Sequence, residues 1–246
     1  MSTKAIAIEG RAVLVTGANR GIGLALVDEA VRRGARQVYA GTRRPLGYPD
    51  ERVTPLTLDV TNAAEIQAAV ERLESLDLLI NNAGVALLDD LSDRTALDQH
   101  LAVNLFGTYG VTQAFLPLLT LSRGAIVNVV SLAAWAAVPI TPAYSISKAA
   151  AFSLTQSLRA LLAGRGVGVH AVLSGPVDTD MIRDWSIPKS SPESVARAIF
   201  GGVEDGEEEI FPDPLSASMA ESWRGGAAKA LERQNAALLQ TAAGNA

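Results

Sequence analysis

A short apolar strand, a glycine-rich turn and a helix follow one another near the start of the chain, and this order most constrains the fold. Residues 12–16 read Ala-Val-Leu-Val-Thr, which is typical of a buried parallel strand. Glycines follow at positions 17, 21 and 23, and apolar residues then recur at helical spacing over residues 22–33. Such glycines let the backbone turn tightly and approach a pyrophosphate at the helix N-terminus. The alternative is a tight strand-helix turn without a ligand.

The residues after the second predicted strand favour a cofactor that carries a 2′-phosphate. No Asp or Glu stands between residues 34 and 49 to accept a hydrogen bond from a ribose 2′-hydroxyl. Arg43 and Arg44 stand there instead, and guanidinium groups bind phosphate in bidentate fashion. We therefore expect NADP(H), with its 2′-phosphate on Arg43 and with help from Arg20 and Thr42. The alternative is that both arginines are ordinary surface charges.

A tyrosine, a lysine and a serine have the spacing of an acid-base site. Tyr144 and Lys148 share one face of a helix predicted over residues 143–163. An ammonium group one turn from a phenol lowers the phenol pKa from about 10 toward neutral pH. A tyrosine tuned in this way can exchange a proton with a substrate oxygen, which Ser131 would hold from the end of a strand. Taken alone, the Tyr-Lys pair also occurs on many solvated helix faces.

In their order along the chain, these motifs resemble the short-chain dehydrogenase/reductase family over nearly the whole length, and Thr42-Arg43 resembles its NADPH-preferring carbonyl reductase branch. The resemblance implies that Asn104, Ser131, Tyr144 and Lys148 are catalytic, with Asn104 supporting a proton-relay water. Two positions depart from the family pattern, since Ser174-Gly175 replaces Pro-Gly and Val130-Ser131 replaces a serine doublet. The residues expected to bind NADP(H) are Gly17, Asn19, Arg20, Gly21, Ile22, Gly23, Thr42, Arg43, Asp59, Val60, Asn82, Ala83, Gly84, Tyr144, Lys148, Gly175, Val177 and Thr179.

The reaction that the resemblance implies is hydride transfer between NADP(H) and a ketone, an aldehyde or a secondary alcohol. One alternative is reduction of a carrier-bound 3-oxoacyl thioester, which would need a basic docking patch; Arg183 and Lys189 are candidates for it. Another is a non-catalytic NADP(H)-binding sensor, although such relatives usually lose the tyrosine or the lysine. A lyase or epimerase would need a longer C-terminal domain.

The substrate side is less defined. Trp135, Met181 and Trp185 are candidate pocket residues because loops at the carboxyl ends of the strands carry the site in this fold. For each tryptophan the alternative is ordinary packing under a loop. The resemblance places a substrate lid at about residues 182–191, and its shortness suggests an open cleft with loose substrate choice.

Composition sets the remaining expectations. The 246 residues, 48% of them hydrophobic, suit one α/β domain: a doubly wound Rossmann fold with about seven parallel strands and helices on both faces. The net charge of −5 disfavours a nucleic-acid partner, and the absence of cysteine excludes disulfides. No membrane span and no signal peptide is evident, so we expect a cytoplasmic protein. We expect no metal, and a solvated loop at the acidic residues 204–209.

The sequence also predicts an oligomeric state and the remaining helices and strands. By resemblance we expect a homotetramer or homodimer that pairs through the outer faces of helices 97–121 and 143–163. Helix 97–121 should be interrupted or should end near Pro117, and helix 219–240 should be weakened at Gly225-Gly226. Further strands are expected at residues 37–40, 53–57, 76–80, 125–130, 167–173 and 209–211, and further helices at residues 62–74 and 192–202.

Overall fold

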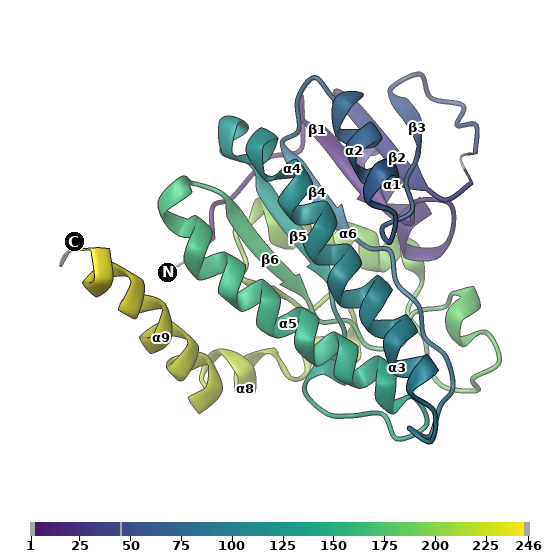
Figure 1. Cartoon of the computed structure of the whole chain (residues 1–246), viewed down its shortest axis with the longest axis vertical. Coiled ribbons are helices and arrows are strands. Elements are labelled where there is room, and N and C mark those ends of the chain that lie inside the picture. Colours follow the sequence, from purple (N-terminus) through teal and green to yellow (C-terminus); the bar gives the residue numbers. More distant parts are fainter. Residues whose placement is uncertain (1–2, 45, 244–246) are drawn as a thin grey trace.

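A single parallel sheet forms the centre of the protein (Figure 1), as the sequence predicts. The computed structural model describes residues 3–44 and 46–243. Within them, seven strands pair in the order β3-β2-β1-β4-β5-β6-β7, all parallel. The strands are β1 (Ala12–Thr16), β2 (Gln37–Thr42), β3 (Val53–Thr57), β4 (Leu78–Asn81), β5 (Ala125–Val129), β6 (Gly168–Val172) and β7 (Glu209–Ile210). The order reverses between β1 and β4, which is where a doubly wound sheet opens its binding crevice.

Helices cover both faces of the sheet (Figure 1). Helices α1 (Gly21–Arg32) and α6 (Pro192–Glu204) pack on one face, and α2 (Ala63–Glu71), α4 (Thr108–Ser122) and α5 (Pro142–Leu162) pack on the other. Alternate residues of β1 serve both faces, since Val13 and Val15 join the core under α1 and α6 while Leu14 joins the core under α4. This two-sided burial explains why the strands read as continuous apolar runs.

Side chains fix where two of these helices begin. The Asn62 side chain accepts hydrogen bonds from the backbone of Ala64 and Glu65 at the start of α2. Ser191 caps α6 through the Ser194 amide, and Pro192 occupies the first helical turn, as the sequence predicts. No helix in the described part of the chain is both long enough and apolar enough to cross a bilayer.

The long helix predicted over residues 97–121 differs from the expectation in three ways. It begins earlier, with α3 (Arg94–His100), and passes through a π-helical segment, Leu101–Gly107, into α4. The expected interruption at Pro117 was wrong, because α4 continues through it to Ser122. Pro117 and Gln113 both lie on the exposed side of α4, so the carbonyl that loses its amide partner faces solvent.

Between residues 214 and 243, the last that the structure describes, the chain forms three helices, α7 (Pro214–Ala217), α8 (Ala220–Arg224) and α9 (Ala227–Ala243). The predicted weak point at Gly225-Gly226 is where α8 and α9 separate. Helix α9 projects from the body of the molecule (Figure 1).

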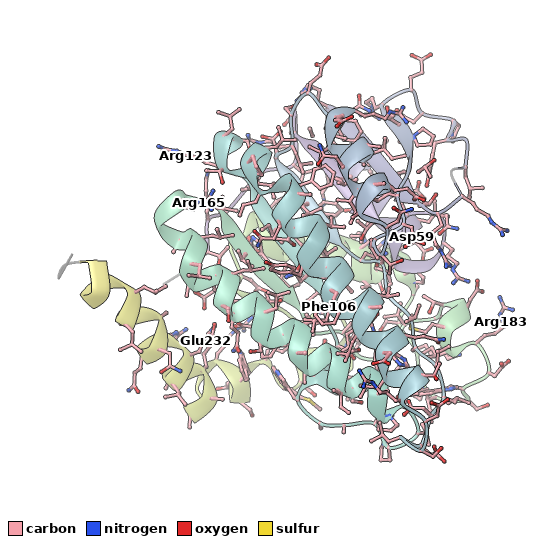
Figure 2. The ribbon with its side chains drawn as sticks, in the orientation of Figure 1. Asp59, Phe106, Arg123, Arg165, Arg183 and Glu232 are labelled. Carbon is pink, nitrogen blue, oxygen red and sulfur yellow. The ribbon has the colours of Figure 1, made fainter. Side chains whose placement is uncertain are left out.

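The acidic run 204–209 is only partly the solvated loop that was expected. Glu209 is buried and pairs with Arg159 of α5 at 2.7 Å and with Lys229 of α9 at 2.9 Å. Lys229 also pairs with Glu208 at 2.7 Å and with Glu232 at 3.0 Å, and Glu232 lies on the side of α9 that faces α5 (Figure 2). These partners lie far from the run in sequence, so the run alone could not reveal them.

Candidate active site

The turn between β1 and α1 has the geometry that a pyrophosphate needs. Gly17 adopts a left-handed backbone with φ 66°, and a Cβ atom at Gly23 would overlap the Gly17 carbonyl oxygen. Helix α1 begins at Gly21 without a side-chain cap, so no side chain occupies its first-turn amides. An anion is therefore a suitable partner for this helix end.

The segment after β4 is tied to the glycine turn. The side chain of Asn82 donates to the Thr16 carbonyl oxygen at 2.9 Å. The backbone amides of Asn82 and Ala83 both donate to Thr16 Oγ1 at 3.0 Å. The structure thus brings together two predicted cofactor-binding segments that are more than sixty residues apart.

The adenosine end of the predicted site is exposed and basic. Arg43 and Arg44 follow β2 and are exposed, whereas the Thr42 side chain is buried and its Oγ1 has no hydrogen-bond partner in the described part of the chain. Asp59 follows β3. Burial acts to raise the pKa of Asp59, but hydrogen bonds from Thr61 and the nearby charge of Arg43 hold it below its ordinary value.

Arg20 has a partner that the sequence did not reveal. Its Nη1 lies 3.3 Å from Asp180 Oδ2, and Asp180 also pairs with Arg183. The three charges link the glycine turn to the segment after β6, beside a cleft of about 390 Å³. The Arg183 side chain points away from the body of the molecule (Figure 2). The contact of Arg20 with a 2′-phosphate stays a prediction.

Asn104 is held inside the π-helical segment by hydrogen bonds on every side-chain polar atom. Its Nδ2 donates to the Val85 carbonyl oxygen at 3.0 Å and to Ser147 Oγ at 2.9 Å, and its Oδ1 accepts from the Val85 amide at 2.9 Å. π-helical turns occur frequently at functional sites. Asn104 therefore joins the loop after β4 to α5, and the sequence had not suggested Ser147 as its partner.

Ser131, Tyr144 and Lys148 meet at the carboxyl end of β5. The Lys148 side chain runs back to the sheet, where Nζ donates to the Val129 carbonyl oxygen at 2.8 Å and lies 5.7 Å from the centre of the Tyr144 ring. Burial lowers the pKa of Lys148 to about 8. Burial also raises the pKa of Tyr144, while a hydrogen bond with Ser131 acts against that rise.

This direction corrects one expectation from the sequence. We expected Lys148 to bring the pKa of Tyr144 down toward neutral pH, but in the structure the pKa lies above its ordinary value. The physical reason is that burial disfavours the phenolate, and spacing along a helix contains no information about burial. At neutral pH Tyr144 is therefore a neutral phenol that keeps its proton.

Both histidines are buried and hydrogen-bonded to backbone groups, as expected for structural residues. The ring nitrogen Nε2 of His100 accepts from the Leu87 amide at 3.0 Å, and Nδ1 lies 2.6 Å from the Ala96 carbonyl oxygen. His100 also meets the Tyr144 ring edge-on, with ring centres 6.2 Å apart. His170 is buried in β6, where burial lowers its pKa to about 4.

The three candidate pocket residues have different surroundings. Trp135 packs into an aromatic cluster, Met181 is 46% exposed, and Trp185 is half-buried. A hydrogen bond from the Asp178 amide to the Ser190 carbonyl oxygen at 2.9 Å joins the chain just before the segment predicted to be the substrate lid to the end of that segment. A role in substrate binding stays a prediction for all three residues.

Asp213 contacts a predicted cofactor-binding residue, Gly175, and nothing in the sequence pointed to this contact. Its Oδ2 accepts a hydrogen bond from the Gly175 amide at 2.7 Å, and a Cβ atom at Gly175 would lie 2.7 Å from its Oδ1. Asp213 also caps α7 through Ser216. Asp followed by Pro214 signals a helix start, but the contact with Gly175 spans 38 positions and no local pattern contains it.

Comparisons with known proteins agree with this geometry. Residues 11–189 match the model of the short chain dehydrogenase family. The chain is 33% identical to 2-(S)-hydroxypropyl-CoM dehydrogenase 3 of Xanthobacter autotrophicus over 229 residues, which covers 83% of this chain and 89% of that protein. It is 35% identical to oxidoreductase UcpA of Salmonella typhimurium over 207 residues, which covers 76% of this chain and 78% of that protein.

A solved structure is similar over almost the whole chain. The short chain dehydrogenase from Burkholderia cenocepacia, crystallised in complex with NADP, superposes with a TM-score of 0.85 at 37% identity, covering 93% of this chain and 98% of that one. The chain belongs to the short-chain dehydrogenase family, and it is an oxidoreductase.

Proposed function

We propose that the protein transfers a hydride between NADP(H) and a carbonyl or secondary alcohol, with reduction of a ketone or aldehyde as the favoured direction. The observation that carries this proposal is the meeting of Ser131, Tyr144 and Lys148 at the end of β5, where Lys148 Nζ lies 5.7 Å from the centre of the Tyr144 ring. The similar Burkholderia protein was crystallised with NADP, which supports the choice of cofactor.

The residues present fit NADP(H). Gly17 and Gly23 allow the tight turn that leads into the uncapped start of α1, whose amides suit a pyrophosphate. Exposed Arg43 offers a guanidinium to the 2′-phosphate, and the buried Thr42 Oγ1 offers an unused hydrogen-bonding group beside it. When bound, the cofactor supplies or accepts the hydride.

The protein groups handle the oxygen and the proton. The Ser131 hydroxyl donates a hydrogen bond to the substrate oxygen, which stabilises the negative charge that develops there. Tyr144 holds its proton at neutral pH, since the ordinary pKa of a phenol is about 10 and burial raises it further, so Tyr144 can donate that proton to the alkoxide as its charge develops. The Lys148 ammonium stands near the Tyr144 ring and stabilises the phenolate that remains. Asn104 would support the water that returns a proton.

The charges around the lid favour a free carbonyl compound over a carrier-bound thioester. Lys189 is only 12% exposed at its side chain and lies 3.8 Å from Asp178, while Arg183 pairs with Asp180. Both candidates for a basic docking patch thus already have acidic neighbours. The sensor alternative is disfavoured because all four catalytic candidates are present, and Asn104, Ser131 and Lys148 are held by hydrogen bonds.

The assay that tests this function is consumption of NADPH against a panel of ketones and aldehydes, with NADH in parallel. We expect turnover with NADPH and weak turnover with NADH. Tight NADPH binding without turnover of any compound would favour the sensor. One compound preferred a thousandfold over all others would contradict the loose selectivity that the short lid suggests.

We further propose a homodimer or homotetramer. Large apolar side chains are exposed on the outer surface of the helical layer: Phe106 (Figure 2), Tyr109, Leu121, Ile146 and Leu161. A second copy that packs on this layer would bury them. Light scattering that reports a 25.7 kDa particle would contradict this assembly.

A further inference from the structure

An aromatic cluster joins the C-terminal segment to the loop that carries Ser131. Trp223 of α8 stacks on Trp135, with ring centres 4.6 Å apart and planes inclined by 20°. Phe152 of α5 and Phe211, which follows β7, meet Trp135 edge-on at 6.4 Å and 5.7 Å. Trp223 and Phe211 lie beyond residue 189, where the match to the family model ends.

One tight turn connects Trp135 to the serine. Ser131 Oγ accepts a hydrogen bond from the Ala133 amide at 3.1 Å, and the Ser131 carbonyl oxygen accepts from the Ala134 amide at 3.0 Å. The Trp135 amide closes the turn on the Leu132 carbonyl oxygen at 2.9 Å. The same turn is also tied to the segment after β6, where the Leu132 amide donates to the Ser174 carbonyl oxygen at 3.0 Å. Trp135 is therefore the large side chain at the far end of the hydrogen-bonded turn that Ser131 begins.

Apolar packing, in which the aromatic rings take the largest part, holds the Trp135 indole. Its Nε1 is buried and has no hydrogen-bond partner within residues 3–44 and 46–243. No polar contact thus replaces the stack if Trp223 is lost. Stacked and edge-on aromatic pairs prefer defined offsets, so the cluster fixes the ring more tightly than aliphatic packing would.

The segment that supplies Trp223 is itself anchored at both ends. Asp213 precedes α7 and binds the Gly175 amide, and Lys229 lies in the first turn of α9. Lys229 is 1% exposed and pairs with three carboxylates, and Arg159 of α5 pairs with two of the same three, so the start of α9 is fixed to β7 and α5. Trp223 lies between these two anchors and packs on Trp135.

We propose that Trp223 is a positioning residue for the catalytic serine, which it holds through the Trp135 stack and the turn 131–135. The expected effect of Trp223 on kcat rests on the proposed oxidoreductase function. A misplaced serine weakens only the interaction with the reacting oxygen, and the glycine turn and Arg43 do not touch this cluster. The effect should therefore fall on kcat and not on NADPH binding.

The test compares Trp223→Ala, Trp223→Phe and Phe200→Leu. Phe200 is a buried aromatic on the opposite face of the sheet, so Phe200→Leu is the control for general destabilisation. We expect Trp223→Ala to lower kcat roughly tenfold while KM for NADPH changes less than twofold, and Trp223→Phe to restore most of the rate. Equal kcat losses in Trp223→Ala and Phe200→Leu, at equal losses of Tm, would overturn the proposal.

A second readout does not depend on turnover. Hydrogen exchange of the peptide that covers residues 131–138 should be faster in Trp223→Ala than in wild type, and unchanged in Phe200→Leu. Unchanged exchange in Trp223→Ala would overturn the proposal. If wild type turned over no substrate, the proposed function would fail, and exchange would still decide whether Trp223 holds the turn. Trp135→Leu, which removes the same stack from the other side, serves if Trp223→Ala does not fold.

Discussion

The two ends of the predicted cofactor cleft are built in opposite ways. At the adenosine end Arg43 and Arg44 are exposed after β2. At the catalytic end Asn104 and Lys148 are 1% and 6% exposed, and each is hydrogen-bonded to a backbone carbonyl oxygen. The contrast follows from the two tasks, since capturing a phosphate needs charge that solvent can reach, whereas moving a proton needs groups fixed before the substrate arrives.

The largest effect should come from the acid at the catalytic end. Tyr144→Phe removes the proton that the alkoxide needs, so kcat should fall by roughly a thousandfold while the Kd for NADPH changes little. Stopped assays with excess enzyme and a fluorescence titration of NADPH would measure both. Tyr109→Phe, on the exposed side of α4, is the matched control and should behave as wild type. Turnover that survives in Tyr144→Phe would show that another group is the acid.

The catalytic end should also respond to pH. The pKa of Lys148 is lowered to about 8, so its ammonium is present below pH 8 and is lost as pH rises through that value. We expect kcat to fall above pH 8, and Lys148→Met to have a much lower kcat that lacks this step. Profiles of kcat from pH 6 to 10 would measure this step, and kcat of wild type should fall about tenfold per pH unit on the alkaline side. A flat wild-type profile would contradict the role of the ammonium.

Lys148 should also make the free energy of unfolding depend on pH, and this quantity should rise over the pH range in which kcat falls. The folded-state pKa lies below the unfolded value, so the unfolded chain binds more protons between the two values. The free energy of unfolding of wild type, relative to Lys148→Met, should therefore rise as pH rises from about 8 toward the ordinary lysine pKa of about 10.4. Urea unfolding at several pH values measures this difference. A fall over that interval would contradict the burial of the ammonium.

At the adenosine end, Arg43→Ala should act on binding alone. Loss of a charge-assisted contact to the 2′-phosphate should raise KM for NADPH about tenfold and leave kcat and KM for NADH unchanged. Added salt should raise KM for NADPH in wild type more than in the variant, because exposed charges are screened. Arg44→Ala is the neighbouring control. A wild type that prefers NADH would contradict the assignment of this end.

The smallest effect concerns Arg20, which touches the segment after β6. Its pair with Asp180 is exposed, and exposed pairs contribute about 0.2–1 kcal/mol. Asp180→Asn should free Arg20 for the 2′-phosphate and lower KM for NADPH by no more than about fivefold. A rise in KM would instead show that Asp180 itself supports cofactor binding.

Much of this fold could be predicted where local pattern determines structure. Strands β1 and β3 have the predicted bounds, Ala12–Thr16 and Val53–Thr57, because buried strands read as short apolar runs that end at turn signals. The candidate catalytic residues lie on the elements expected for them, since motif order along the chain determines which strand end carries each one.

The rest depended on contacts between distant residues. The sequence could not show that Glu209 is buried against Lys229 or that Asp213 binds the Gly175 amide. It also gave the wrong direction for the pKa of Tyr144, because burial is set by the packing of α5 on the sheet and by the loop after Ser131. Trp135 was open to two interpretations for the same reason.

The most direct test of the division between the two ends is one steady-state experiment on wild type, Tyr144→Phe and Arg43→Ala. NADPH concentration is varied at saturating ketone, and kcat and KM are read separately. The two-ended site predicts that Tyr144→Phe loses kcat with KM for NADPH nearly unchanged, and that Arg43→Ala raises KM with kcat unchanged. If either variant changed both constants by similar factors, or if the two patterns were exchanged, binding and chemistry would not be divided between these ends of the cleft.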